Sequence, residues 1–234
     1  MTYVPQKDPV TGMITMVRAG SRGRPSAAFW TALVGAPIPE DKLSAESRED
    51  ALDAIAIAVF GGGDVSEVIE YVLEVETDET EEAEVAHFRA ILEGYVSTAR
   101  AAHEAAAATW TGDTDNDRVA KAFAEMNAAG IVARERLGQS LSDGEYEIDE
   151  IVDEMIANGE TVRGNVFYHA QDAERAMTGG GLMLAYTGDG TGAEAARLIG
   201  HEIVAILERN GLKPVWNGHP DHRIKVDMEW RRRP

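Results

Sequence analysis

The last residues of the chain alternate strictly between apolar and polar side chains. Ile224, Val226, Met228 and Trp230 are interleaved with the charged residues of the segment 223–231. Because successive side chains of a β-strand point to opposite faces of a sheet, this period of two predicts a strand with one buried face. One-sided burial is typical of antiparallel strands, so we expect a mixed sheet and not a wholly parallel one.

The first half of the chain has a different period, in which apolar residues recur three and four positions apart. This spacing gathers them on one face of a helix, and it predicts three helices. Their expected starts are near Ser44 or Ser47, at Asp64 as a helix cap with Glu67 three residues later, and at Thr80. Each apolar stripe covers only part of its helix, so the helices are expected to pack against one another or against the next domain.

These patterns predict an α+β fold with three regions. Residues 1–42 are rich in Pro and Gly and are expected to form an irregular N-terminal arm, in which Met13–Val17 is a candidate for a short strand. Residues 43–112 are expected to form a helical subdomain that packs on the third region. Residues 113–234 alternate helix and strand patterns and are expected to form a mixed α/β domain with a sheet of about five strands.

The composition excludes several kinds of site. The 234 residues contain no cysteine, which rules out disulfide bridges, iron–sulfur clusters, cysteine-ligated zinc and a thiol nucleophile. The net charge is −19, from 41 acidic and 22 basic residues, so binding to nucleic acid or to an anionic membrane surface is disfavoured. We find neither a secretory signal nor an apolar run of the roughly 18 residues that a membrane helix needs, and we expect a cytoplasmic protein.

The acidic residues are clustered along the sequence. No Lys or Arg occurs between Arg48 and Arg89, or between Arg136 and Arg163. One interpretation is that these stretches are solvated helix faces, and the other is that they bind a basic protein partner.

A group of polar residues marks the most suggestive candidate site. Tyr168, His169, Gln171, Asp172 and Arg175 lie where a predicted strand ends and a short helix begins. His169 could act as a general base with Asp172 beside it. The alternative is structural, with Asp172 or Gln171 capping the helix and His169 bonded locally.

A glycine-rich turn is a second candidate. Gly188, Gly190 and Gly192 fit the pattern that lets a backbone approach a pyrophosphate at a helix N-terminus. The next predicted strand ends at Trp216–Asn217 without the acidic residue that holds a ribose, and a flexible turn is the competing interpretation.

Three acidic or histidine patterns resemble metal sites only in part. The first two are the series from Asp113 to Asp117 and from Asp143 to Glu147, each of which lacks the glycine of a calcium loop. Helix capping is favoured for the first series, and the apolar residues around the second have the register of a helix. The third is His219 with His222, for which an exposed turn is the favoured interpretation. We therefore predict no metal and no cofactor.

The basic end of this acidic chain, including Trp230 and Arg231, is expected either to dock on the protein itself or to contact a partner.

Part of the chain resembles an uncharacterised bacterial family, found mainly in high-GC Gram-positive (actinobacterial) bacteria. The resemblance covers roughly residues 118–233 and is most specific around His169 to Arg175. It also involves Ala122–Phe123, Gly130–Arg134, Val166–His169, Gly179–Leu182 and the Trp–Arg–Arg–Arg tail. The resemblance implies that this part of the chain is a folded domain, and it implies no particular activity. Relatives often carry a cysteine cluster where this chain has Gly138–Ser142, so no metal or redox role of such cysteines applies here.

Two hypotheses of function remain. The first is a non-catalytic acidic interaction or regulatory protein, which would bind a basic protein partner. The second is a small-molecule or nucleotide-binding protein, which could also be an enzyme. Its site would lie near Tyr168–Arg175 or Gly188–Gly192.

Overall fold

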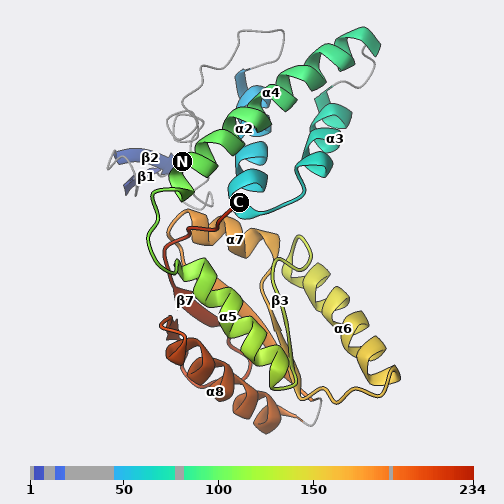
Figure 1. Cartoon of the computed structure of the whole chain (residues 1–234), viewed down its shortest axis with the longest axis vertical. Coiled ribbons are helices and arrows are strands. Elements are labelled where there is room, and N and C mark those ends of the chain that lie inside the picture. The colour runs from blue at the N-terminus through green and yellow to red at the C-terminus, as the bar shows by residue number, and fades with distance from the viewer. Residues whose placement is uncertain (1–2, 8–13, 19–44, 77–81, 190–191) are drawn as a thin grey trace. The chain divides into compact units, whose positions relative to one another are not determined.

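The structure, a computed structural model, describes residues 3–7, 14–18, 45–76, 82–189 and 192–234. It contains two compact units (Figure 1). The first comprises Met1–Trp110 with Arg233–Pro234, and the second comprises Thr111–Arg232. Among the described residues, no helix is both long and apolar enough to cross a membrane.

The first unit contains three helices that contact one another: α2 (Ala45–Gly61), α3 (Val65–Glu76) and α4 (Glu82–Ala107). The predicted stripes supply their shared core, which includes Ile55, Ile69 and Leu92. Asp64 caps α3 as expected, because its Oδ1 accepts the backbone N–H of Ser66 at 2.7 Å. The predicted start at Thr80 lies outside the described residues.

Two short strands lie within the range predicted to be an irregular arm. These strands, β1 (Tyr3–Lys7) and β2 (Ile14–Arg18), pair antiparallel. The rest of residues 1–42 lies outside the described residues.

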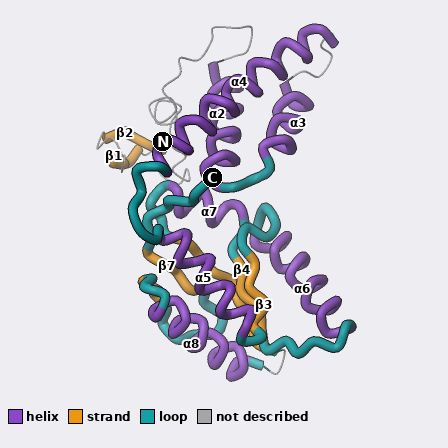
Figure 2. The backbone as a smooth tube through the Cα atoms, in the orientation of Figure 1, coloured by secondary structure: helices purple, strands orange, loops and turns teal. Residues whose placement is uncertain are grey.

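The second unit alternates helices and strands (Figure 2). Its elements are, in order, α5 (Asp115–Ala128), β3 (Ile131–Arg134), α6 (Leu141–Ala157), β4 (Gly164–Phe167), α7 (Ala170–Met177), β5 (Leu182–Gly188), α8 (Ala193–Arg209), β6 (Lys213–Val215) and β7 (Ile224–Asp227). The strand order is β3-β4-β5-β7-β6, in which β3 and β4 are parallel and the other neighbours antiparallel. The predicted α+β class and the mixed sheet of five strands are therefore confirmed.

Helices cover both faces of this sheet. On one face, α5 and α8 bury a core that includes Phe123, Val166, Ile203 and Ile224. On the other face, α6 packs on a smaller cluster around Phe167. Figure 1 shows α6 on the opposite side of the sheet from α5 and α8.

The terminal strand is shorter than its alternation predicts. Ile224 and Val226 are fully buried as expected, but β7 ends at Asp227. The neighbouring strands supply no partner beyond the pairs that join Val226 to Leu182 and Asp227 to Lys213. Trp230 therefore lies outside the strand, although it still packs against the same core.

The parallel strands β3 and β4 end at Arg134 and Phe167, and α7 begins three residues after β4, at Ala170. The backbone of Leu137 bonds to the carbonyl of Tyr168, at 2.9 Å. The chain thus leaves the sheet at the carboxyl ends of its two parallel strands, and the candidate residues follow there.

An asparagine side chain blocks one edge of the sheet, and a proline blocks the other. At the β3 edge, the Asn127 amide accepts the N–H of Ala133 at 2.9 Å and donates to its carbonyl at 3.2 Å. At the other edge, β6 has only three residues and Pro214 at its centre.

Candidate functional site

His169 and Asp172 form a buried pair at the start of α7. Their side chains are 6% and 5% exposed, and His169 Nε2 lies 3.0 Å from Asp172 Oδ2. The same oxygen accepts the backbone N–H of His169 at 3.3 Å, so Asp172 stabilises the first turn of the helix that it belongs to.

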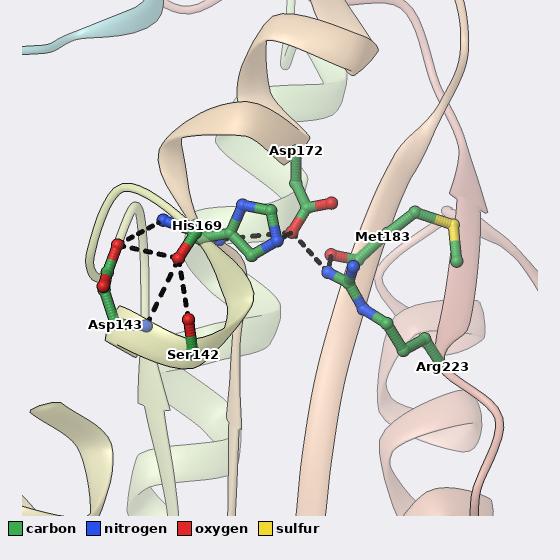
Figure 3. A network of polar contacts seen from close by, with 7 residues as sticks. Ser142, Asp143, His169, Asp172, Met183 and Arg223 are labelled. Carbon is green, nitrogen blue, oxygen red and sulfur yellow. Dashed lines mark hydrogen bonds and ion pairs between the residues drawn. The ribbon is translucent and has the colours of Figure 1, made fainter. Parts of the chain in front are cut away.

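A third residue, Arg223, completes this network. Its Nη2 donates to Asp172 Oδ2 and to the carbonyl of Met183, the latter at 2.9 Å. Figure 3 shows the Asp172 carboxylate lying between the His169 ring and the Arg223 guanidinium. One carboxylate oxygen thus joins α7, the end of β4 and the residue that precedes β7.

This geometry favours a structural role for the pair. A general base must reach the proton that it abstracts, and both side chains here are buried. Asp172 Oδ2 also accepts hydrogen bonds from the His169 backbone N–H and from Arg223, and it contacts His169 Nε2. The network explains why a charged residue is tolerated in the interior, because a buried carboxylate needs both a counter-charge and hydrogen bonds.

The other residues of the segment do not converge on this pair. Arg175 is exposed, and its Nε donates to the carbonyl of Gly180 at 3.3 Å. Gln171 is bonded through its backbone N–H to the carbonyl of Gln139. The cation that meets Asp172 is Arg223, which the sequence interpretation missed.

Tyr168 belongs to a separate polar group. Its ring is buried between Phe123 and Trp230, with centroid distances of 6.1 and 6.4 Å. Its Oη donates to Glu135 Oε2 at 3.1 Å, and Arg232 Nη1 donates to the same oxygen at 2.9 Å. Burial is the main cause that raises the pKa of Tyr168, followed by the negative charge of Glu135, so the phenol stays protonated near neutral pH.

The basic end of the chain lies on α5. The backbone N–H of Glu229 donates to Asp115 Oδ2 at 3.0 Å, and that of Arg231 donates to Asn116 Oδ1 at 2.7 Å. The Arg231 side chain pairs with Glu229. The segment that contains Trp230 and Arg231 is therefore docked on the second unit.

The glycine-rich turn is described only at its two ends, since Gly190 lies outside the described residues. A Cβ at Gly188 would lie 2.7 Å from the backbone N of Ala196, so this glycine allows α8 to pack closely on β5. Gly192 precedes α8 with a φ of 106°, which only glycine adopts readily. The strand before this turn is antiparallel to both neighbours, unlike the parallel strands of a dinucleotide-binding fold.

The calcium-like patterns are helix caps in the described structure. Thr114 with Asp117 and Ser140 with Asp143 form capping boxes at α5 and α6. Among the described residues, no three His, Asp or Glu side chains are grouped so that they could hold a metal ion.

Helix α6 presents the most acidic surface of the second unit. Six of its carboxylates are exposed: Asp143, Glu145, Asp149, Glu150, Asp153 and Glu154. Acidic residues on the other long helices of this unit pair with arginines, as in Asp115–Arg118, Glu125–Arg209, Glu194–Arg197 and Glu202–Arg163. Within the described part of the chain, no ion pair involves a residue of α6.

Two large apolar side chains are exposed on the same helix. Tyr146 is 65% exposed and Ile156 is 54% exposed. Tyr146 also donates its Oη to Glu150 at 2.8 Å, and this hydrogen bond raises the pKa of the Tyr146 phenol. The outer face of α6 therefore combines unpaired negative charge with apolar contact area.

Comparisons with known proteins yield one family model. A model described as a domain of unknown function, DUF6891, matches residues 40–234. Neither a curated protein nor a solved structure matches the chain. The predicted resemblance to a family of unknown function is thus confirmed. The match is longer than the predicted range of 118–233, because it also includes α2, α3 and α4.

Proposed function

Since the chain belongs to the DUF6891 family, whose function is unknown, we propose a function from its own surface: it is a non-catalytic interaction protein. The exposed face of α6 binds a basic segment of a partner protein. The proposal includes a cytoplasmic location and a bacterial, mainly actinobacterial, source.

The observation that carries this proposal is the contrast between α6 and its neighbours. Asp149, Glu150, Asp153 and Glu154 are exposed and have no cationic partner among the described residues, whereas α5 and α8 pair their acids with arginines. Acids four positions apart on a helix repel one another, which weakens the helix that carries them. A bound Lys or Arg side chain would remove this repulsion.

The apolar residues supply the second part of a protein-binding surface. Contacts between exposed charges contribute little each, and buried aromatic anchors usually dominate the affinity of an interface. Tyr146 lies on the outer face with Glu150, one helical turn away, so a basic segment with an apolar side chain could contact both. Electrostatic attraction would mainly raise the association rate.

The test compares two sets of four substitutions that change the net charge equally. The first set neutralises α6: Asp149→Asn, Glu150→Gln, Asp153→Asn and Glu154→Gln. The control set neutralises exposed acids of α3 and α4: Glu67→Gln, Glu74→Gln, Glu93→Gln and Glu104→Gln. Binding of a labelled short peptide of Lys and Leu residues is measured by fluorescence anisotropy at two salt concentrations.

We expect the α6 set to raise the Kd at least about tenfold at low salt, while the control set changes it by less than about twofold. Tyr146→Ala should also weaken binding, and Tyr71→Ala, which removes an equally exposed tyrosine of α3, should not. Equal weakening by both sets would mean that only net charge matters and would reject the α6 surface.

A further inference from the structure

Arg136 has an unusual backbone conformation directly after β3. Its φ is 51°, and it is the only non-glycine residue with a positive φ in the described part of the chain. L-residues with a side chain avoid this left-handed region because their Cβ approaches the following carbonyl oxygen. Such strain persists only where the surroundings fix it, and it is concentrated at binding sites.

The loop that holds Arg136 is fixed on both sides. The N–H of Leu137 donates to the carbonyl of Tyr168 at 2.9 Å, and the N–H of Ala170 donates to that of Gly138 at 3.0 Å. Gly138 packs so closely that a Cβ there would lie 2.5 Å from the backbone N of Gly144. The loop therefore cannot relax to relieve the conformation of Arg136.

One nitrogen of the Arg136 guanidinium has no acceptor among the described residues. This nitrogen, Nη1, is buried. Burial is the main cause that lowers the pKa of Arg136; Tyr168 and Glu174 raise it in part, and the nearby Arg232 guanidinium lowers it again. A buried N–H donor of a cation without an acceptor is costly, so Nη1 of the partly buried Arg136 favours an additional negative group.

The Glu135–Arg232 ion pair does not provide this group. Glu135 Oε2 already accepts hydrogen bonds from Tyr168 Oη and from Arg232 Nη1. The guanidiniums of Arg136 and Arg232 thus lie at one end of the sheet together with the Glu135 carboxylate, which is hydrogen-bonded to Arg232. This end is formed by the carboxyl ends of the parallel strands β3 and β4, where α/β folds commonly bind ligands.

We infer that Arg136 anchors an oxyanion-binding site at the carboxyl end of β3, which takes a carboxylate or phosphate group of a small molecule with Arg232 as the second cation. The planar fork of an arginine suits both groups, because two parallel N–H donors match two oxygens. This site is separate from the α6 surface and does not depend on its proposed function.

The test uses the full chain with inorganic phosphate and, separately, acetate as probes. Each is titrated at constant ionic strength, balanced with chloride, and followed through backbone amide and arginine Nε–H signals in NMR spectra. The variant Arg136→Gly removes the guanidinium and tolerates the positive φ, so it should remain folded. Arg136→Lys keeps the charge without the fork, and Arg197→Met is a control that removes a partly exposed arginine of α8.

We expect saturable shifts at Leu137 and at the Arg136 side chain, with a Kd in the millimolar range or below for at least one probe. Arg136→Gly should weaken that Kd at least about tenfold, Arg136→Lys by less, and Arg197→Met by under about twofold. A preference for phosphate over acetate, or the reverse, identifies the group. Absence of saturation by about 50 mM of either probe, or equal affinity in Arg136→Gly, would overturn the inference.

Discussion

Gly144→Ala should destabilise the second unit, although a glycine within a helix usually gains stability when it becomes alanine. Gly144 is buried in the first turn of α6. A Cβ at this position would lie 2.3 Å from Phe167 Cε2 and 2.7 Å from the carbonyl oxygen of Leu137. Both distances are shorter than real Cβ contacts, and one of the two atoms belongs to the backbone, which cannot move aside cheaply.

The expected size follows from two opposing effects. Overpacking of a core costs about 1–3 kcal/mol, and the overlap with a backbone oxygen places Gly144 near the upper end of that range. The better helix propensity of alanine returns about 1 kcal/mol. We therefore expect the free energy of unfolding of the second unit to fall by about 2 kcal/mol.

The measurement is urea denaturation, followed by circular dichroism at the helix band and by tryptophan fluorescence. Gly94→Ala is the matched control, because Gly94 lies within α4 and a Cβ there would have no atom within 4 Å. It should raise the stability of the first unit by about 1 kcal/mol. If Gly144→Ala proves as stable as the native chain, the close packing of α6 on Phe167 is wrong.

Two further predictions concern the buried polar groups. Asp172→Ala leaves the Arg223 guanidinium without its carboxylate and should lower the free energy of unfolding by about 3 kcal/mol, whereas Asp221→Ala, at an 84% exposed side chain, should change it by less than about 0.5 kcal/mol in the same urea assay. Tyr168→Phe should reduce the alkaline sensitivity of the fold: the pKa of Tyr168 is raised above its unfolded value of about 10, so its contribution is complete below that pH and is lost as pH rises above it. A native chain and a Tyr168→Phe variant with the same loss of stability between about pH 9 and 11 would contradict this.

The helices of both units could be predicted because their signals are local. Apolar residues three and four positions apart form the stripe of α5, and its cap joins Thr114 to Asp117 within a single turn. The alternation around Ile224 predicted β7 for the same reason. The end of β7 could not be predicted, because it depends on where the partner strands β5 and β6 stop.

The candidate site was predictable only in its local part. His169 and Asp172 are three residues apart, so their contact follows from the helix that they begin. Arg223 meets Asp172 across 51 residues, and Arg232 meets Glu135 across 97 residues, so no local pattern predicts either contact. The strained conformation of Arg136 also has no sequence signature, since glycine is the residue that normally marks a positive φ.

The blocked edges of the sheet restrict how any other protein can join this fold. Unpaired strand edges invite an extended peptide to add as an extra strand, and they also promote self-association into fibrils. Here the Asn127 amide acts as a substitute strand beside Ala133, and Pro214 removes a donor on the far side. Strand addition is therefore disfavoured at both edges, so a partner of the second unit is expected to contact side chains on its helices and loops.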